Sequence, residues 1–378
     1  MNYLITITAG LTFFYIILIL YYVIKWRKIP LSELSTTHSP KVSIIIAARN
    51  EEQHILSCVE SCLNQNYPSS QFEVIVVDDQ SEDDTYSLLE NIKDPKFKLM
   101  RLGVWKRTTI QGSKKKAIAY GVSHANGDII LTTDADCIVK ENWIHSMTDK
   151  LLRDNLDMVT GPVQIKSEKG FLNKFQILDF MSSCLMNAVG IQTKIHFLGN
   201  GANLAFKKNV FIELMGFEGN ENIASGDDVF MMRKIANRSK DKIQFNKSKE
   251  AIVTTLAMPT LKSFYSQRLR WAGKMKYLFS FTLGLILNIV FWQRISIFIS
   301  IIFGLLFHQY IIIYVAVGCL VLRWLIDFIL HYHAALFFDN KKILNYSIPL
   351  NTFFSFYFVS LAILSWLPLN IEWKDRKI

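Results

Sequence analysis

The chain begins with a long stretch that carries no charge. Residues 1–24 contain no Asp, Glu, Lys, Arg or His, whereas Lys25, Arg27 and Lys28 follow directly. A helix of ~20 apolar residues is long enough to cross the hydrocarbon core of a bilayer. A cleaved signal peptide would instead carry its basic residues before a shorter apolar stretch. We therefore expect an uncleaved transmembrane helix over residues 1–25, and the positive charges behind it predict that the next segment is cytoplasmic.

Two further apolar blocks lie toward the other end of the chain. The first covers residues 277–338 and the second covers residues 348–369. The first block is long enough for two spans, and its polar pairs at 293–294 and 308–309 are both possible breaks. We favour two long spans there and one in the last block. This predicts about three helices over 277–370, followed by a basic tail over 371–378.

The fully charged residues inside the first of these blocks are Arg294, Arg323 and Asp327. Arg323 and Asp327 are four residues apart, a spacing that places them on one face of a helix. An ion pair between them would lower the cost of burying each charge. We favour this structural role over a role in transport.

The segment between the apolar blocks, residues 26–276, has the polar content of a folded domain and is expected to carry the chemistry. The chain is 51% hydrophobic overall, but much of that content belongs to the apolar blocks. The net charge of +10 suits a surface that faces anionic lipids and phosphorylated substrates. Nucleic acid is not expected as a partner, because no nucleic-acid-binding signature accompanies the charge. Cys58 and Cys62 are expected on a buried helix face rather than as metal ligands.

Short β-branched runs alternate with helical patterns in this segment. Strands are predicted at 42–48, 72–79, 97–102 and 128–134, with a helix after each of the first three. Ser81 is expected to cap the second of these helices. The order is typical of a doubly wound α/β sheet, in which ligands bind beyond the carboxyl ends of the strands.

Polar side chains follow the predicted strands at that edge of the sheet. The first strand leads into AARNEE (47–52), where a dinucleotide-dependent redox enzyme would carry GxGxxG, so redox chemistry is disfavoured. Asp78 and Asp79 end the second strand, and Asp134 and Asp136 end the fourth. Carboxylates repel a diphosphate unless a divalent cation lies between them, so the pattern predicts a Mg²⁺ or Mn²⁺ site. A solvated turn is the competing interpretation of each Asp pair.

Six motifs occur in order along the segment: VSIIIAARNEE (42–52), VIVVDDQSEDDT (74–85), DIILTTDADCIVKENW (128–143), GNGANLAFKK (199–208), SGDDVF (225–230) and QRLRW (267–271). In this series the chain resembles the membrane-associated glycosyltransferases of family 2. The resemblance implies a GT-A fold, here a mixed α/β sheet domain flanked by transmembrane helices. It also implies a nucleotide-sugar donor, a divalent metal and inversion at the anomeric carbon.

The resemblance further implies roles for single residues. Residues implied to bind the donor are Ala47, Arg49, Glu51, Asp78, Asp79, Lys114 and Asp134. Asp134 and Asp136 match the DxD motif that holds the metal, with Asp136 as the direct ligand, and Asp228 matches the catalytic base. Family members commonly have Glu before that base, where this chain has Asp227, and the shorter carboxylate can alter the hydrogen bonding there.

Two motifs point to the acceptor or to the leaving diphosphate. Gln267, Arg270 and Trp271 match the QxxRW motif of many processive members, and the loop over 197–203, with Gly199 and Asn200, matches one near the acceptor. A cationic aromatic helix lying at the membrane surface is an equally open interpretation of residues 267–271.

The chemistry of sugar transfer agrees with these assignments. Transfer needs a base that activates the acceptor hydroxyl and a cation that neutralises the leaving diphosphate. Asp228 and the predicted metal site meet these two needs. We therefore expect a membrane-bound, metal-dependent hexosyltransferase whose acceptor is lipid-linked or a growing polysaccharide and whose catalytic domain is cytoplasmic. A membrane protein that keeps the fold for binding or transport without catalysis is the alternative.

Overall fold

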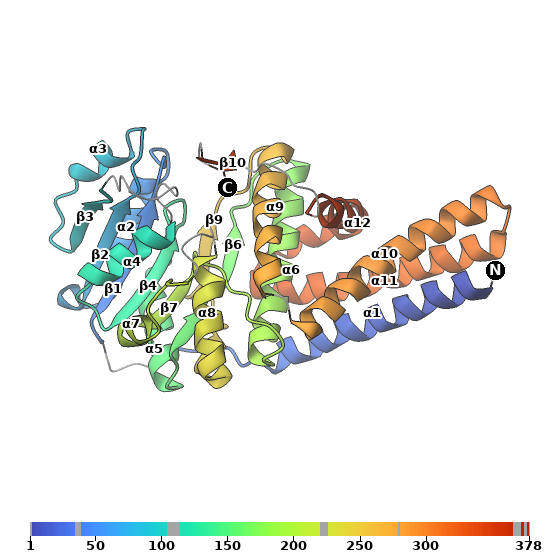
Figure 1. The fold of residues 1–378 in the computed structure, drawn as a ribbon, viewed down its shortest axis with the longest axis horizontal. Coiled ribbons are helices and arrows are strands. Elements are labelled where there is room, and N and C mark those ends of the chain that lie inside the picture. The colour runs from blue at the N-terminus through green and yellow to red at the C-terminus, as the bar shows by residue number, and fades with distance from the viewer. Residues whose placement is uncertain are drawn as a thin grey trace. The chain divides into compact units, whose positions relative to one another are not determined.

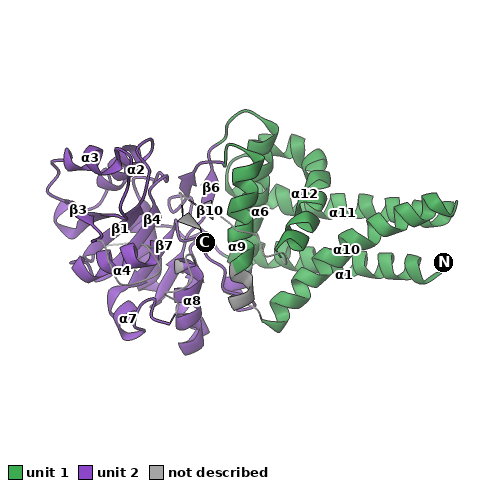
Figure 2. Cartoon of the chain, turned by 45° about the horizontal axis from the view of Figure 1, so that its top comes forward, with its two compact units in different colours: residues 1–29, 167–189, 258–371 green, residues 30–166, 190–257, 372–378 purple. Residues whose placement is uncertain are grey.

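The computed structural model describes residues 2–34, 39–103, 114–219, 226–278, 280–365, 372–373 and 376–377 (Figure 1). The chain divides into two compact units (Figure 2). The helical unit comprises residues 1–29, 167–189 and 258–371, and the α/β unit comprises residues 30–166, 190–257 and 372–378. Each unit therefore collects segments that are distant from one another in the sequence.

A seven-stranded sheet forms the centre of the α/β unit, in the order β3-β2-β1-β4-β7-β5-β8. Four strands form a block of parallel neighbours: β1 (Val42–Ala48), β2 (Phe72–Asp78), β3 (Phe97–Arg101) and β4 (Ile129–Asp134). They are the four predicted strands, and no end differs from its predicted position by more than one residue. The Val and Ile runs of β1, β2 and β4 are buried, as expected for strands covered on both faces.

Within this sheet, β7 runs against all the other strands and makes the sheet mixed. Strand β7 (Leu204–Lys207) is antiparallel to β4 and to β5 (Met158–Thr160), and β8 (Ile243–Phe245) is parallel to β5. Two small sheets pair β6 (Val163–Ile165) with β9 (Val253–Thr255), and β10 (Glu372–Trp373) with β11 (Arg376–Lys377). Strands this short show no clear period in a sequence, so the sequence pattern does not predict them.

The helices of the α/β unit are α2 (Ile55–Leu63), α3 (Thr85–Glu90), α4 (Lys114–His124), α5 (Trp143–Arg153), α7 (Lys208–Glu213) and α8 (Asp227–Arg238), with 3-10 turns at Ser69–Gln71 and Lys240–Lys242. Helix α4 lies so close to the sheet that a Cβ on Gly121 would be 2.7 Å from the Ile45 side chain. Cys58 and Cys62 are both fully buried in α2, as predicted. The expectation for Ser81 is wrong, because α3 begins only at Thr85 and Ser81 precedes it by several residues.

A buried histidine packs against the end of α6 (Phe171–Gln192). The His196 ring lies against Gly190, where an added Cβ would be 2.0 Å from Cε1 of the imidazole. Burial lowers the pKa of His196 to about 4, so the ring is neutral at physiological pH. The contact therefore depends on a glycine at position 190.

We expect Gly190→Ala to lower the free energy of unfolding by roughly 2 kcal/mol, because a methyl group inserted into a packed contact forces the buried ring to move. Thermal unfolding of the purified chain measures the change. Gly103→Ala is the matched control, since the described residues leave open space around that position. The double variant with His196→Ala should regain stability, and equal melting of the two glycine variants would contradict the packing argument.

The helical unit contains α1 (Asn2–Lys28), most of α6, α9 (Leu261–Leu278), α10 (Phe281–Leu306), α11 (Tyr310–Phe337) and α12 (Ser347–Leu364), with a 3-10 segment at Lys341–Tyr346. Within its described residues, four helical stretches are long and apolar enough to cross a membrane: Asn2–Lys28, Phe281–Leu306, Tyr310–Phe337 and Lys341–Leu364. The first apolar block thus holds two long helices. The chain breaks between them at 308–309, whereas Gln293 and Arg294 lie inside α10.

A polar network joins these apolar helices. The predicted pair forms, with Arg323 Nε 3.8 Å from Asp327 Oδ2. Asp327 also accepts hydrogen bonds from the Tyr15 hydroxyl (2.5 Å) and from Asn351 Nδ2 (2.8 Å), so α1, α11 and α12 meet at one carboxylate. Burying an ionised side chain is costly unless it is paired and hydrogen-bonded, and Asp327 meets both conditions.

Candidate active site

The loops that follow β1 and β2 are tied together at the carboxyl ends of those strands. The backbone N–H groups of Glu51 and Glu52 donate to the side chains of Thr85 (2.7 Å) and Asp83 (3.1 Å). In return, the N–H of Asp84 donates to a Glu52 carboxylate oxygen (3.1 Å). These reciprocal bonds hold the AARNEE loop against the loop after β2.

The Arg49 side chain also links these two loops. Its side chain is 7% exposed, and Nη1 donates to the carbonyl oxygens of Asp79 (2.9 Å) and Gln80 (2.7 Å). Its Nη2 pairs with the exposed carboxylate of Glu82 at 2.9 Å. The guanidinium therefore fixes the backbone of the loop after β2, and a contact between Arg49 and the donor stays a prediction.

We expect Arg49→Met to raise the KM for the donor roughly 30-fold while kcat changes less, because the loop loses two backbone hydrogen bonds and an ion pair with Glu82, whereas the reacting atoms lose no contact. Steady-state kinetics separate the two constants. Arg153→Met removes a guanidinium from α5, where it pairs with Asp149, and serves as the control. A wild-type donor KM in Arg49→Met would show that the loop does not need this brace.

Two more of the predicted donor residues, Ala47 and Asp78, lie at or near the ends of β1 and β2. Ala47 is in register with Val77 on one side and Asp134 on the other. Asp78 is fully buried, accepts from the Ser81 N–H (3.2 Å) and pairs with Arg101 Nε at 3.2 Å. These contacts engage Asp78 in its own loop, and its contact with a base or ribose stays a prediction.

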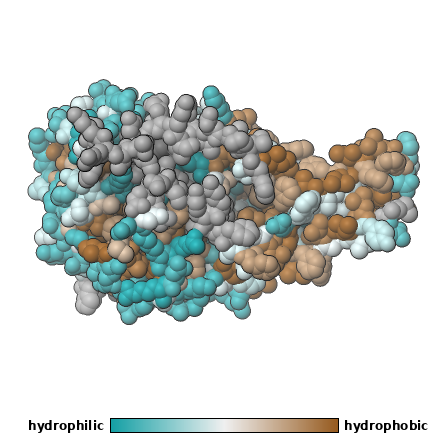
Figure 3. Space-filling model, viewed as in Figure 1, coloured by the Kyte–Doolittle hydropathy of each residue, from teal (hydrophilic) through white to brown (hydrophobic). Residues whose placement is uncertain are grey.

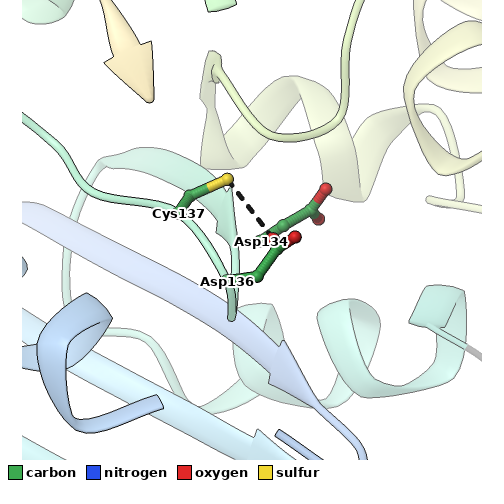
Figure 4. A group of neighbouring side chains, drawn as sticks. All are labelled: Asp134, Asp136 and Cys137. Carbon is green, nitrogen blue, oxygen red and sulfur yellow. Dashed lines mark hydrogen bonds between the residues drawn. The ribbon is translucent and has the colours of Figure 1, made fainter. Parts of the chain in front are cut away.

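The two carboxylates of the DxD motif lie at the end of β4, and Figure 4 shows them beside Cys137. One ligand atom from each of Asp134, Asp136 and Cys137 lies within 4.8 Å of the other two. Asp134 pairs with Lys114 Nζ at 2.5 Å, so the structure brings together two residues that were predicted to bind the donor. Asp136 accepts from the Thr255 hydroxyl at 3.2 Å.

Cys137 is a hydrogen-bond donor in this cluster. Its Sγ lies 3.5 Å from Asp136 Oδ1, and the thiol is buried. Burial, together with the charges of Asp136 and Asp134, raises the pKa of the Cys137 thiol well above its ordinary value. A thiol with a raised pKa is a poor metal ligand, so the carboxylate oxygens of Asp134 and Asp136 are the atoms of this cluster that would bind a cation. Oxygen ligands suit a hard cation such as Mg²⁺ or Mn²⁺. The residues present fit the predicted metal.

Asp228 is linked to β4 through the backbone of Gly201. Asp228 lies in the first turn of α8, and its Oδ2 accepts from the Gly201 N–H at 3.2 Å. The Gly201 carbonyl in turn accepts from the Thr132 hydroxyl at 3.1 Å, and Thr132 lies on β4 shortly before Asp134. The side chain of Asp227 lies outside the described residues.

The loop that contains Gly201 packs tightly on α8. A Cβ on Gly199 would be 2.6 Å from Met232 Sδ, so position 199 has no room for a side chain unless the methionine moves. Asn200 closes the turn, since its Oδ1 accepts from the Ala202 N–H at 3.0 Å. A contact of Gly199 and Asn200 with the acceptor stays a prediction.

Several residues that shape the site were missed by the sequence reasoning, among them Thr132, Thr255 and Asn203. Asn203 is fully buried, accepts from Trp143 Nε1 (2.9 Å) and donates to the Ala251 carbonyl (2.6 Å). The sequence signal that could have identified Asn203 is an amide residue directly before the apolar run of β7. Thr132 and Thr255 carry no such signal, because β-branched residues are ordinary in strands.

Gln267, Arg270 and Trp271 belong to α9, in the helical unit. Arg268, which lies between Gln267 and Arg270, forms a buried ion pair: its Nη2 lies 2.7 Å from Asp179 Oδ2 of α6, and both side chains are buried. The guanidinium of Arg268 also lies 4.5 Å from the Trp271 ring centre. The roles of Gln267, Arg270 and Trp271 toward a substrate stay predictions.

Two family models match the chain. One, described as glycosyl transferase family 2, matches residues 43–214, and the other, glycosyl transferase family group 2, matches residues 129–367. The probable glycosyltransferase YdaM of Bacillus subtilis (strain 168) is 27% identical over 257 residues, which cover 67% of this chain and 58% of YdaM.

A poly-beta-1,6-N-acetyl-D-glucosamine synthase of Staphylococcus epidermidis is 23% identical over 61% of this chain and 53% of the synthase. The chain thus spans little more than half the length of these curated relatives.

The fold also occurs in a solved structure. The mannosyltransferase PcManGT from Pyrobaculum calidifontis, determined in complex with GDP-Man and Mn²⁺, superimposes with a TM-score of 0.59. The two sequences are 20% identical, and the superposition covers 96% of this chain and 98% of that one. This likeness supports the predicted GT-A fold.

Proposed function

The chain belongs to glycosyl transferase family group 2, and on that premise we propose that it transfers a sugar from a nucleoside diphosphate, with inversion, to a lipid-linked or growing polysaccharide acceptor. The observation that carries the proposal is the link from Thr132 through Gly201 to Asp228. This link fixes a buried carboxylate to the strand that ends in the DxD motif. A base and a cation site that are held in a fixed position relative to one another are what a direct displacement requires.

Different residues would bind the donor and hold the cation. The tied loops after β1 and β2 form the donor side, and Arg49 keeps the backbone of the second loop in place. A divalent cation held by Asp134 and Asp136 would neutralise the diphosphate as it leaves. Lys114 supports Asp134 through their 2.5 Å contact and adds a positive charge on the diphosphate side.

Asp228 acts on the acceptor. Its carboxylate is held by the N–H groups of Gly201 and Val229, so it keeps one orientation while it takes the proton of the acceptor hydroxyl. The hydroxyl oxygen then attacks the anomeric carbon as the bond to the diphosphate breaks, which inverts that centre. No covalent enzyme intermediate is needed.

Two further observations support the proposed acceptor and location. The relative from Staphylococcus epidermidis is named for the synthesis of a polysaccharide. In the part of the chain that the structure describes, four helices are long and apolar enough to cross a bilayer. We therefore propose a membrane-bound enzyme whose α/β unit is cytoplasmic.

A donor screen tests the proposal. The full chain is purified in detergent and given membrane lipid extract, Mn²⁺ or Mg²⁺, and each common nucleotide sugar in turn, and release of the nucleoside diphosphate is followed. We expect turnover with one donor class, and the anomeric configuration of the product, read by NMR, should be opposite to that of the donor. Absence of turnover with every donor would favour a binding protein that keeps the fold without catalysis.

A further inference from the structure

A groove lies between α4 and α7, and none of the residues assigned to sugar transfer lines it. It has a volume of about 740 Å³, and we call it the α4–α7 groove. Its lining includes Lys115, Lys116 and Lys208 together with Phe211, Met215 and Phe217. Neither the DxD carboxylates nor Asp228 line it. A volume of this size is ample for a small polar headgroup.

The outer edge of the groove is apolar and exposed. Ile212 is 61% exposed and Met215 is 65% exposed, both on or just after α7. Figure 3 shows an apolar patch over α7 that is bordered by hydrophilic surface. Large aliphatic side chains gathered beside lysines, on an otherwise polar surface, are typical of a surface that rests in a lipid interface.

The charge of the groove is positive. Among the described lining residues, three lysines face one acidic side chain, Glu218. Lys208 is anchored, since its Nζ donates to the Ala125 carbonyl at 2.6 Å, and Lys115 packs 4.3 Å from the centre of the Phe230 ring. Two of the three cations, those of Lys208 and Lys115, are thus held by the fold. A lysine ammonium binds phosphate as a compact point charge.

We propose that the α4–α7 groove binds the headgroup of an anionic phospholipid, with Ile212 and Met215 inserted at the level of the acyl chains. Charge complementarity selects the anion, and the exposed aliphatic residues select a phosphate that carries chains over a free one. Among the described residues, four helices are long and apolar enough to cross a bilayer, so the α/β unit belongs to a chain that we propose is membrane-bound. The site needs neither donor nor metal, so it stands apart from the proposed transfer reaction.

Binding of short-chain lipids to the detergent-purified full chain tests the proposal. Dihexanoyl phosphatidylglycerol, dihexanoyl phosphatidylcholine and inorganic phosphate are titrated in parallel, with binding measured by calorimetry. Each cation near an anionic lipid is worth about a fivefold change in affinity, so the charge reversal Lys116→Glu should weaken phosphatidylglycerol binding roughly 25-fold. Lys93→Glu makes the same change at an exposed lysine after α3 and should leave binding unaltered. Lipid bound elsewhere on the apolar helices contributes equally to both variants and cancels in the comparison.

The outcomes are distinct. Tighter binding of phosphatidylglycerol than of phosphatidylcholine, lost in Lys116→Glu and kept in Lys93→Glu, supports the proposal. Equal binding of the two lipids, or an unchanged affinity in Lys116→Glu, overturns it. Inorganic phosphate that binds as tightly as the lipid would make this a free-anion site and also overturns it. So would a change in oligomeric state in Lys116→Glu without loss of lipid, because the groove would then be a contact between copies of the chain.

Discussion

Asp228→Asn should lower kcat roughly 1,000-fold and leave the dissociation constant of the donor close to wild type. The amide keeps the size of the carboxylate but cannot take the proton of the acceptor hydroxyl, and loss of a general base typically costs about 10²- to 10⁴-fold. Donor binding should survive because Asp228 sits on α8, whereas the donor loops follow β1 and β2. Release of the nucleoside diphosphate gives kcat, and calorimetry gives the donor affinity.

Two comparisons keep this result interpretable. The amide can accept only one of the two backbone hydrogen bonds that Gly201 and Val229 donate to Asp228, so thermal unfolding must show that the variant is folded. Asp241→Asn makes the same chemical change at a carboxylate that is 75% exposed and should keep full activity. Turnover of Asp228→Asn within about tenfold of wild type would remove Asp228 from the role of base.

The strands that build the site could be predicted because their own residues determine them. Residues 42–48, 72–78 and 129–134 are runs of β-branched and apolar side chains, a pattern that marks a strand buried on both faces wherever it occurs. Since parallel strands end at one edge of the sheet, Asp78, Asp134 and the AARNEE loop could be placed together without knowledge of the packing.

The supporting contacts could not be predicted, because they join residues that are far apart in the chain. Thr255 reaches Asp136 from β9, and Gly201 reaches Asp228 from the loop before β7. Both β7 and β9 are too short to show a period. Arg49 illustrates a second limit: its position in the motif indicates a donor site, but only the fold shows that its guanidinium braces carbonyl groups of the neighbouring loop.

The second large effect is expected at the metal site, where Asp136→Asn should weaken Mn²⁺ binding and lower transfer roughly 1,000-fold at a fixed Mn²⁺ concentration. An amide oxygen is a weaker ligand than a carboxylate for a hard cation, and the diphosphate would then meet Asp134 with less positive charge between them. Mn²⁺ affinity, measured by electron paramagnetic resonance without donor, gives a readout that does not depend on turnover. Treatment with EDTA should abolish transfer, and added Mn²⁺ should restore it.

Variants at Thr255 and Thr254 test the assignment of Asp136 as the metal ligand through a smaller, graded change in Mn²⁺ affinity. The Thr255 hydroxyl donates to Asp136, so Thr255→Val should weaken Mn²⁺ binding by about 10- to 100-fold, the usual cost of removing a hydrogen bond that orients a metal ligand. Thr254 lies beside it on β9, but its hydroxyl accepts from Gln164 Nε2 at 3.1 Å, so Thr254→Val should leave Mn²⁺ affinity unchanged.

If the two valine variants bind Mn²⁺ equally well, Asp136 does not depend on the Thr255 contact. If Asp136→Asn also binds Mn²⁺ like wild type, the cation is held elsewhere. A graded loss from Thr255→Val to Asp136→Asn would instead identify Asp136 as the ligand and β9 as the strand that orients it.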